Sequence, residues 1–203
     1  IQPKIRGGGS KLIKKKGDLH GSIRGTDYPS FDLLPADFSY RKLDLTLSDA
    51  EKAEKRLRRI VKSLSGDYDH LVLDCAPGMS LLSEGVFRVA DLLVVPTIPT
   101  PLSLRTLEQI RSYFDKKGLD SAKVRPFLSM VDRRRSLHRS VSDSAPADRP
   151  FRFFETGIPY SSLVEQMGVE RAPLHVYSPY CSPSRSFRSL WGEIREALTA
   201  SSD

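Results

Sequence analysis

The chain has 203 residues, about the length of one domain. Apolar residues make up 39% and charged residues 28%, which excludes the disordered and fibrous classes of protein, and neither an apolar run of about 18 residues nor a signal peptide is found. Cys75 and Cys181 form no C-x-x-C pair, so the sequence argues against a zinc site. It predicts a cytoplasmic protein that does not bind a membrane.

Residues 1–30 carry most of the net charge. Over residues 1–24, seven Lys and Arg against one Asp give +6 of the total +7. The segment is rich in Gly, Lys and Ser without apolar periodicity, so we interpret 1–30 as flexible and 31–203 as the folded domain. Its run Gly7-Gly8-Gly9-Ser10-Lys11 is not a phosphate-binding loop, because such a loop needs Gly before the lysine and Ser or Thr after it.

Between residues 31 and 64 the pattern predicts a short strand and a long helix. Phe31–Leu34 indicates a strand that Pro35 stops, and Ser48 and Glu51 have the spacing of a capping box. The helix that follows, to residue 64, has apolar side chains at intervals of three and four and a basic opposite face. A nucleic-acid contact and a solvated face both fit that basic side, and the solvated face is the commoner meaning.

The following residues alternate apolar runs with amphipathic stretches. Strands are predicted over 70–74, 92–95 and 124–131, and helices over about 82–90 and 104–118. Continuous apolar strands separated by amphipathic helices predict an α/β fold, in which a mostly parallel sheet is covered by helices on both faces.

The rest of the chain is predicted to complete this fold. The polar stretch 132–150 indicates a long loop with one helical turn, followed by a fourth strand over 151–154 and a short helix around 161–167. A last helix has Pro183 in its first turn. Trp191 lies on the apolar stripe of that helix, so we expect it to pack in the core.

Three features fall at the carboxyl ends of predicted strands, where open parallel sheets bind their ligands: Asp74, Ser129–Asp132 and Ile158-Pro159. An aspartate at such a place fits a magnesium ion, which prefers oxygen ligands and keeps much of its water, and it equally fits a cap for the next helix. The Pro77-Gly78 pair that follows lets a backbone amide approach a phosphate, since glycine has no side chain to block it.

Four segments in this order resemble the ParA/MinD branch of the P-loop ATPases, which carries a deviant Walker motif. They are Leu71–Gly78, Ala90–Pro96, Phe127–Arg134 and Gly157–Pro159, and Leu33–Asp37 matches the segment before the long helix of ParA-like proteins. The resemblance extends from about Asp27 to Leu198. It implies a P-loop NTPase-like sheet that lacks its first strand and phosphate-binding loop.

The resemblance also implies the roles of individual residues toward ATP and Mg²⁺. Asp74 looks like the Walker B aspartate that serves the metal, and Pro77 and Gly78 like the switch that senses the terminal phosphate. The residues that resemble those flanking the adenine are Ser129, Met130, Asp132 and Pro159.

Two parts of the family pattern are absent from these 203 residues. ParA-like ATPases carry a Lys-Gly-Gly-x-Gly-Lys-Ser/Thr loop, which holds the phosphates, and a further aspartate that activates water. The chain contains neither, and it begins at Ile1 rather than Met. We therefore expect an N-terminally truncated chain without catalytic residues of its own, which does not hydrolyse ATP alone.

Relatives of the ParA type imply an ATP-dependent homodimer, nonspecific DNA and a ParB-like or cargo adaptor protein as partners. The tail after Leu198 has no basic amphipathic extension, which favours the ParA side over the membrane-binding MinD side. The candidate contacts to DNA phosphates are Arg133, Arg134, Arg135 and Arg139, with Lys116 and Lys117 beside them. The alternative for this cluster is a solvated loop.

Two functions fit the sequence. The first is a ParA-like ATPase for chromosome or plasmid partitioning or for cargo positioning. The second is a degenerate protein of the same fold, which binds no nucleotide and acts as an interaction or regulatory partner. The coding sequence upstream of Ile1 distinguishes them, because the first function needs an in-frame phosphate-binding loop there.

Overall fold

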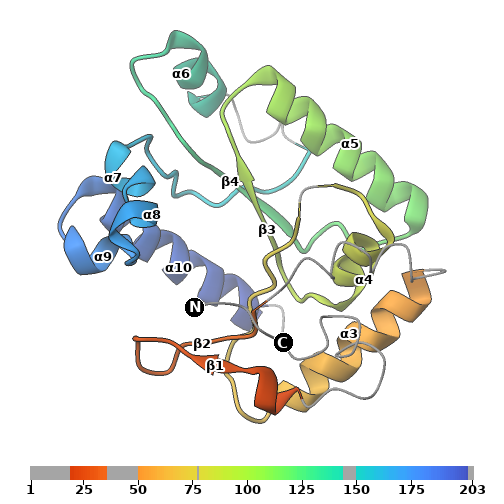
Figure 1. The fold of residues 1–203 in the computed structure, drawn as a ribbon. Helices are drawn as coiled ribbons and strands as arrows, with labels where there is room; N and C mark the ends of the chain where they lie inside the picture. Colours follow the sequence, from red (N-terminus) through yellow and green to blue (C-terminus); the bar gives the residue numbers. More distant parts are fainter. Residues whose placement is uncertain (1–18, 36–49, 77, 144–149, 201–203) are drawn as a thin grey trace. The chain divides into compact units, whose positions relative to one another are not determined.

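A computed structural model describes residues 19–35, 50–76, 78–143 and 150–200 (Figure 1). The chain divides between Ala90 and Asp91 into two compact units, which are described one at a time. The domain boundary predicted at residue 30 stays a prediction, and Ser48 of the predicted capping box lies outside the described residues.

The first unit begins with a 3-10 turn, η1 (His20–Ser22), and a small hairpin. Strand β1 (Arg24–Gly25) pairs antiparallel with β2 (Asp32–Leu33). The hydroxyl of Thr26 holds the turn between them, since it donates to the carbonyl of Phe31 at 2.6 Å. The strand predicted over residues 31–34 is therefore present in a shorter form.

Two packed helices form the rest of the first unit. Helix α3 spans Ala50–Leu64 and α4 spans Leu81–Val89, as their apolar spacing predicts. Ala53 and Leu64 of α3 are buried, and Arg58 of α3 donates to the carbonyl of Arg88 at 3.4 Å. The N-cap of α4 is Ser80, whose hydroxyl accepts the amide N–H of Ser83.

Gly85 lies where α4 contacts α3. A Cβ atom at this position would lie 2.7 Å from the Cβ of Ala53 and 3.2 Å from the backbone of α3. We expect Gly85→Ala to lower the free energy of unfolding by about 1–3 kcal/mol through this overlap, although alanine itself favours a helix by about 1 kcal/mol. Chemical denaturation followed by circular dichroism measures the change.

Gly192 offers the matched control for this substitution, because a Cβ there meets nothing within 4 Å in its helix. Gly192→Ala is expected to leave stability unchanged or to raise it. A Gly85→Ala protein as stable as the Gly192→Ala protein would contradict the close packing of α3 on α4.

The prediction of a strand over residues 70–74 is wrong. Residues 70–76 are in no strand, and the side chains of Leu71, Val72 and Leu73 are exposed, with Val72 at 82%. A continuous apolar run becomes a buried strand only where neighbouring strands and covering helices surround it. Within the described residues this run has no strand paired with it.

The second unit contains a parallel strand pair with helices on both faces. Strands β3 (Leu93–Thr97) and β4 (Val124–Leu128) pair in register from Leu93 opposite Val124. Helix α5 (Pro101–Lys117) connects them and lies on one side of the pair in Figure 1, with α10 (Ser182–Ala200) on the other. Thr100 caps α5 at its start and Gly118, at φ 60°, at its end. The predicted α/β class is confirmed.

The strand ends differ from the prediction. Pro96 lies inside β3 rather than after it, at an exposed position where a proline is tolerated. Strand β4 ends at Leu128, because Met130 has a left-handed backbone at φ 56° that breaks the ladder. Residues 151–154, predicted as a fourth strand, are in no strand, and a single parallel bridge joins Val131 to Pro159.

The helical part of this unit is larger than predicted. Helix α6 (Ser136–Asp143) is longer than the single turn expected in the loop, and three short helices precede α10. These are α7 (Ser162–Glu165), α8 (Met167–Glu170) and α9 (Leu174–Tyr177).

The core of the second unit joins α10 to β4. Phe127, Phe154, Ile158 and Leu190 form a buried cluster, and Ile194 packs against it. The prediction that Trp191 packs in this core is wrong, since its side chain is 40% exposed. An α-helix makes one turn every 3.6 residues. Trp191, the residue after Leu190, therefore points well away from the face that Leu190 and Ile194 share.

Candidate functional site

The carboxyl ends of β3 and β4 bring two predicted site segments together. The amide of Ser129 donates to the carbonyl of Thr97 at 2.9 Å, and the amide of Val131 donates to the carbonyl of Ile158 at 3.0 Å. The amide of Tyr160 returns a bond to the carbonyl of Val131 at 3.0 Å. Ser129–Asp132 and Ile158-Pro159 therefore lie side by side, at the edge where open parallel sheets bind ligands.

Met130 stands at the centre of this edge in a strained conformation. A left-handed backbone costs a residue with a Cβ about 1–2 kcal/mol. The neighbouring bonds of Ser129 and Val131 hold it there, and its side chain is 44% exposed. Backbone strain that persists in this way is found most often at functional sites.

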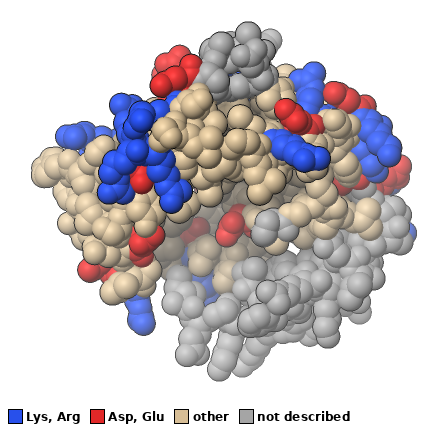
Figure 2. Space-filling model, turned by 90° about the horizontal axis from the view of Figure 1, so that it is seen from above, with Lys and Arg blue, Asp and Glu red and all other residues tan. Residues whose placement is uncertain are grey.

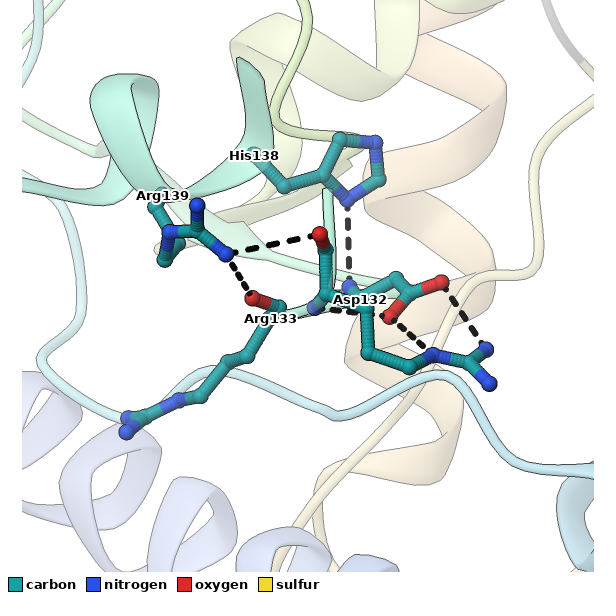
Figure 3. A network of polar contacts seen from close by, with 5 residues as sticks. Asp132, Arg133, His138 and Arg139 are labelled. Carbon is teal, nitrogen blue, oxygen red and sulfur yellow. Dashed lines mark hydrogen bonds and ion pairs between the residues drawn. The ribbon is translucent and has the colours of Figure 1, made fainter. Parts of the chain in front are cut away.

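Asp132 begins a hydrogen-bonded turn that leads into α6 (Figure 3). Its carboxylate accepts two bonds from the guanidinium of Arg134, both at 3.0 Å, and one from the Arg134 amide at 3.1 Å. Its own amide donates to Nδ1 of His138, a side chain only 4% exposed, at 3.1 Å. The guanidinium of Arg139 donates to the carbonyls of Arg133 and Arg134.

The bonds from Arg134 lower the pKa of Asp132 from 3.8 to about 2, first through its side chain and then through its backbone. A carboxyl group with a depressed pKa stabilises the folded state above its unfolded pKa, and that contribution is lost as the pH falls through the folded pKa. We expect the Asp132–Arg134 pair to persist at pH 4 and to be lost toward pH 2.

Carboxyl ¹³C NMR titration measures this pKa directly. Arg134→Ala removes the side-chain donor and is expected to return the pKa of Asp132 toward 3.8. An Asp132 that still titrates near pH 2 in the Arg134→Ala protein would show that another group depresses its pKa.

The four arginines predicted as DNA contacts are not equivalent. Arg134 and Arg139 are engaged within the turn, by the Asp132 carboxylate and by backbone carbonyls. All four arginines are exposed, and the Arg133 side chain extends away from this network in Figure 3. Figure 2, seen from the end where α6 lies in Figure 1, shows a dense group of Lys and Arg side chains at the left of this face and further Lys and Arg side chains at its right.

The predicted metal and phosphate residues lie in the first unit. Asp74 is exposed, Pro77 lies outside the described residues, and Gly78 is exposed at φ 131°, a backbone that favours glycine. Asp74 does not cap the next helix, because α4 starts at Leu81 with Ser80 as its N-cap. The structure therefore contradicts the capping alternative for Asp74.

The donor set available for a metal is small. No group of three His, Cys, Asp or Glu side chains gathers among the described residues. Asp74 offers one solvent-exposed carboxylate. This fits Mg²⁺, which is commonly bound through one or two carboxylates and keeps several waters, and it does not fit a closed zinc site.

Glu193 is a residue of this region that sequence reasoning missed. Its carboxylate accepts the backbone N–H of Glu155 at 2.7 Å and that of Thr156 at 3.0 Å, just before Gly157–Pro159. These partners are 38 and 37 residues away in the sequence, and no local pattern indicates such a contact.

Within the part of the chain described, no helix is long and apolar enough to cross a membrane.

Known sequences similar to this chain include chromosome partitioning proteins. A family model described as an AAA domain matches residues 9–122, more than half of the chain. The chromosome partitioning protein ParA of Caulobacter vibrioides is 25% identical over 178 residues, which cover 83% of this chain and 66% of that protein. The sporulation initiation inhibitor protein Soj of Bacillus subtilis is 22% identical over 187 residues, covering 90% and 74%. The chain thus spans about two thirds of the length of ParA.

Solved structures show the same fold. An ATP complex of McdA from Cyanothece superposes with a TM-score of 0.73 at 16% identity, over 93% of this chain and 74% of that one. The cell division ATPase MinD of Pyrococcus furiosus gives a TM-score of 0.65 at 17% identity, over 92% and 74%. The predicted P-loop NTPase-like fold is confirmed.

Proposed function

The chain belongs to the AAA domain family, in the ParA/MinD branch of P-loop ATPases, and on this premise we propose that it works in a nucleotide-driven partitioning or positioning ATPase. The observation that carries the proposal is the pairing of Ser129–Asp132 with Ile158-Pro159 at the carboxyl ends of β3 and β4. Both segments are held by backbone bonds at the place where parallel sheets bind ligands.

We propose a division of roles among the named residues. Met130 and Pro159 would contact the adenine through their apolar surfaces, with Ser129 and Asp132 beside it. Asp74 would hold Mg²⁺, and Pro77 and Gly78 would lie against the terminal phosphate. The bound Mg²⁺ would neutralise charge on the phosphates as the terminal one is transferred to water.

ATP hydrolysis would depend on residues beyond these 203. They include no Lys-Gly-Gly-x-Gly-Lys-Ser/Thr loop, and we propose that they do not hydrolyse ATP alone. The test compares Mg²⁺-dependent hydrolysis by this chain with that by the protein translated from its whole reading frame. Hydrolysis only by the longer protein supports the proposal, whereas a reading frame without such a loop and a protein that binds no ATP would favour the degenerate interaction protein.

Three kinds of partner follow from this function as proposals. An ATP-dependent homodimer is tested by light scattering with and without ATP, and a ParB-like or cargo adaptor by co-purification with the whole protein. Nonspecific DNA is proposed to bind at Arg133 and Arg135, because their exposed guanidinium groups extend from a turn that Arg134 and Arg139 hold in place.

A further inference from the structure

The segment from Phe154 to Tyr160 runs beside β4 with one interruption. The amide of Phe154 donates to the carbonyl of Pro126 at 2.8 Å, and the amide of Ile158 donates to that of Leu128 at 2.8 Å. Between them, the amides of Glu155 and Thr156 donate to the Glu193 carboxylate instead. A side chain of α10 therefore satisfies two amides that donate to no carbonyl of β4.

The surroundings of Glu193 make this contact a fixed one. The guanidinium of Arg125 in β4 stacks on the ring of Phe154 at 4.7 Å. Burial lowers the pKa of Arg125, Arg152 lowers it further, and the charge of Glu193 opposes both. Phe154 and Ile158, which flank the interruption, are buried in one cluster with Leu190 of α10. The carboxylate thus acts on the partly buried guanidinium of Arg125, and the two amides that it accepts come between two buried residues of the chain.

The next three residues, Gly157–Pro159, lie against the end of β4 and the residues after it. A Cβ on Gly157 would make ordinary van der Waals contacts, at 3.5 Å, with the carbonyl oxygen of Leu128 and with Val131. Ile158 then bonds to Val131, and Pro159 forms the bridge to it. Because Glu155 and Thr156 directly precede this segment, their bonds to Glu193 restrict where Gly157–Pro159 can lie.

We propose that Glu193 is a positioning residue, which fixes the Gly157–Pro159 segment against Ser129–Asp132 and so sets the shape of the surface that would meet the nucleotide base. This role rests on the proposed function for its ligand, although the anchoring itself does not. Glu193 makes no contact with the base in this scheme and acts only through the backbone that it holds.

Hydrogen exchange tests the anchoring in the chain as it is. Glu193→Ala should speed exchange at the amides of Glu155, Thr156, Val131 and Ile158 by about tenfold or more, since bonds to a charged acceptor are strong. Glu193→Gln keeps one acceptor oxygen and should give a smaller change. Glu196→Ala, an exposed glutamate of the same helix, is the control and should give none. Unchanged exchange in Glu193→Ala would overturn the proposal.

Nucleotide binding tests the link to the base, in the protein translated from the whole reading frame. Glu193→Ala should weaken binding of Mg²⁺-ATP by about tenfold and bring its affinity closer to that for GTP, which shares the phosphates but not the base. Unchanged ATP affinity and ATP-to-GTP ratio, with faster exchange, would overturn the base-side role. A wild-type protein that binds no ATP would overturn the proposed function itself, and exchange would still decide the anchoring.

Discussion

Asp74→Ala is expected to lower Mg²⁺-dependent ATP hydrolysis by at least about a hundredfold in the protein that includes its phosphate-binding loop. The metal supplies several kcal/mol of charge stabilisation to phosphoryl transfer, and this aspartate is the carboxylate proposed to hold it. Because the Asp74 side chain is exposed and caps no helix, its loss should leave the free energy of unfolding nearly unchanged. Steady-state hydrolysis and thermal unfolding are measured on the same preparation.

Asp69→Ala is the matched control, since Asp69 is an exposed aspartate five positions earlier in the same segment. It removes the same charge and should keep wild-type turnover. Wild-type turnover in Asp74→Ala would refute the metal assignment. A wild-type protein that contains the loop and hydrolyses no ATP would instead count against the ATPase function and favour the degenerate alternative.

Local signals explain why the sequence predicts much of the second unit. Helix α5 starts after Thr100 and ends before Gly118, and both caps depend only on residues within the helix and beside it. The strand-end segments at 129–132 and 158–159 follow from short apolar runs closed by polar residues or proline. The main α/β order therefore follows from periodicity and punctuation.

The errors arise where structure depends on distant partners. The run at residues 70–74 has the composition of a buried strand, yet Val72 is 82% exposed because burial requires neighbours that composition does not supply. Met130 ends β4 early through a backbone angle that few residues with a side chain adopt. Glu193 reaches Glu155 across 38 residues, a contact that no local pattern predicts.

The double substitution Arg133→Ala, Arg135→Ala is expected to weaken nonspecific DNA binding by roughly 60-fold at 0.1 M salt. Each phosphate contact contributes a slope of about 0.9 to the dependence of log affinity on log salt. Two contacts therefore raise the affinity at 0.1 M salt by a factor of about 10 to the power 1.8 over that at tenfold higher salt, and the double substitution removes this factor. The slope itself should fall by about two. Fluorescence anisotropy with a mixed-sequence duplex, at several salt concentrations, measures both quantities.

Arg185→Ala, Arg195→Ala is the control, because it removes the same charge from exposed positions on α10. If binding came only from the net charge of +7, both pairs would weaken it alike. If Arg133 and Arg135 contact the phosphates directly, only their substitution should weaken DNA binding, since exposed charges act over about 10 Å at this salt concentration. Equal losses, or no loss at Arg133 and Arg135, would show that this turn is a solvated loop, because the ordered network beneath it would then present no phosphate contacts.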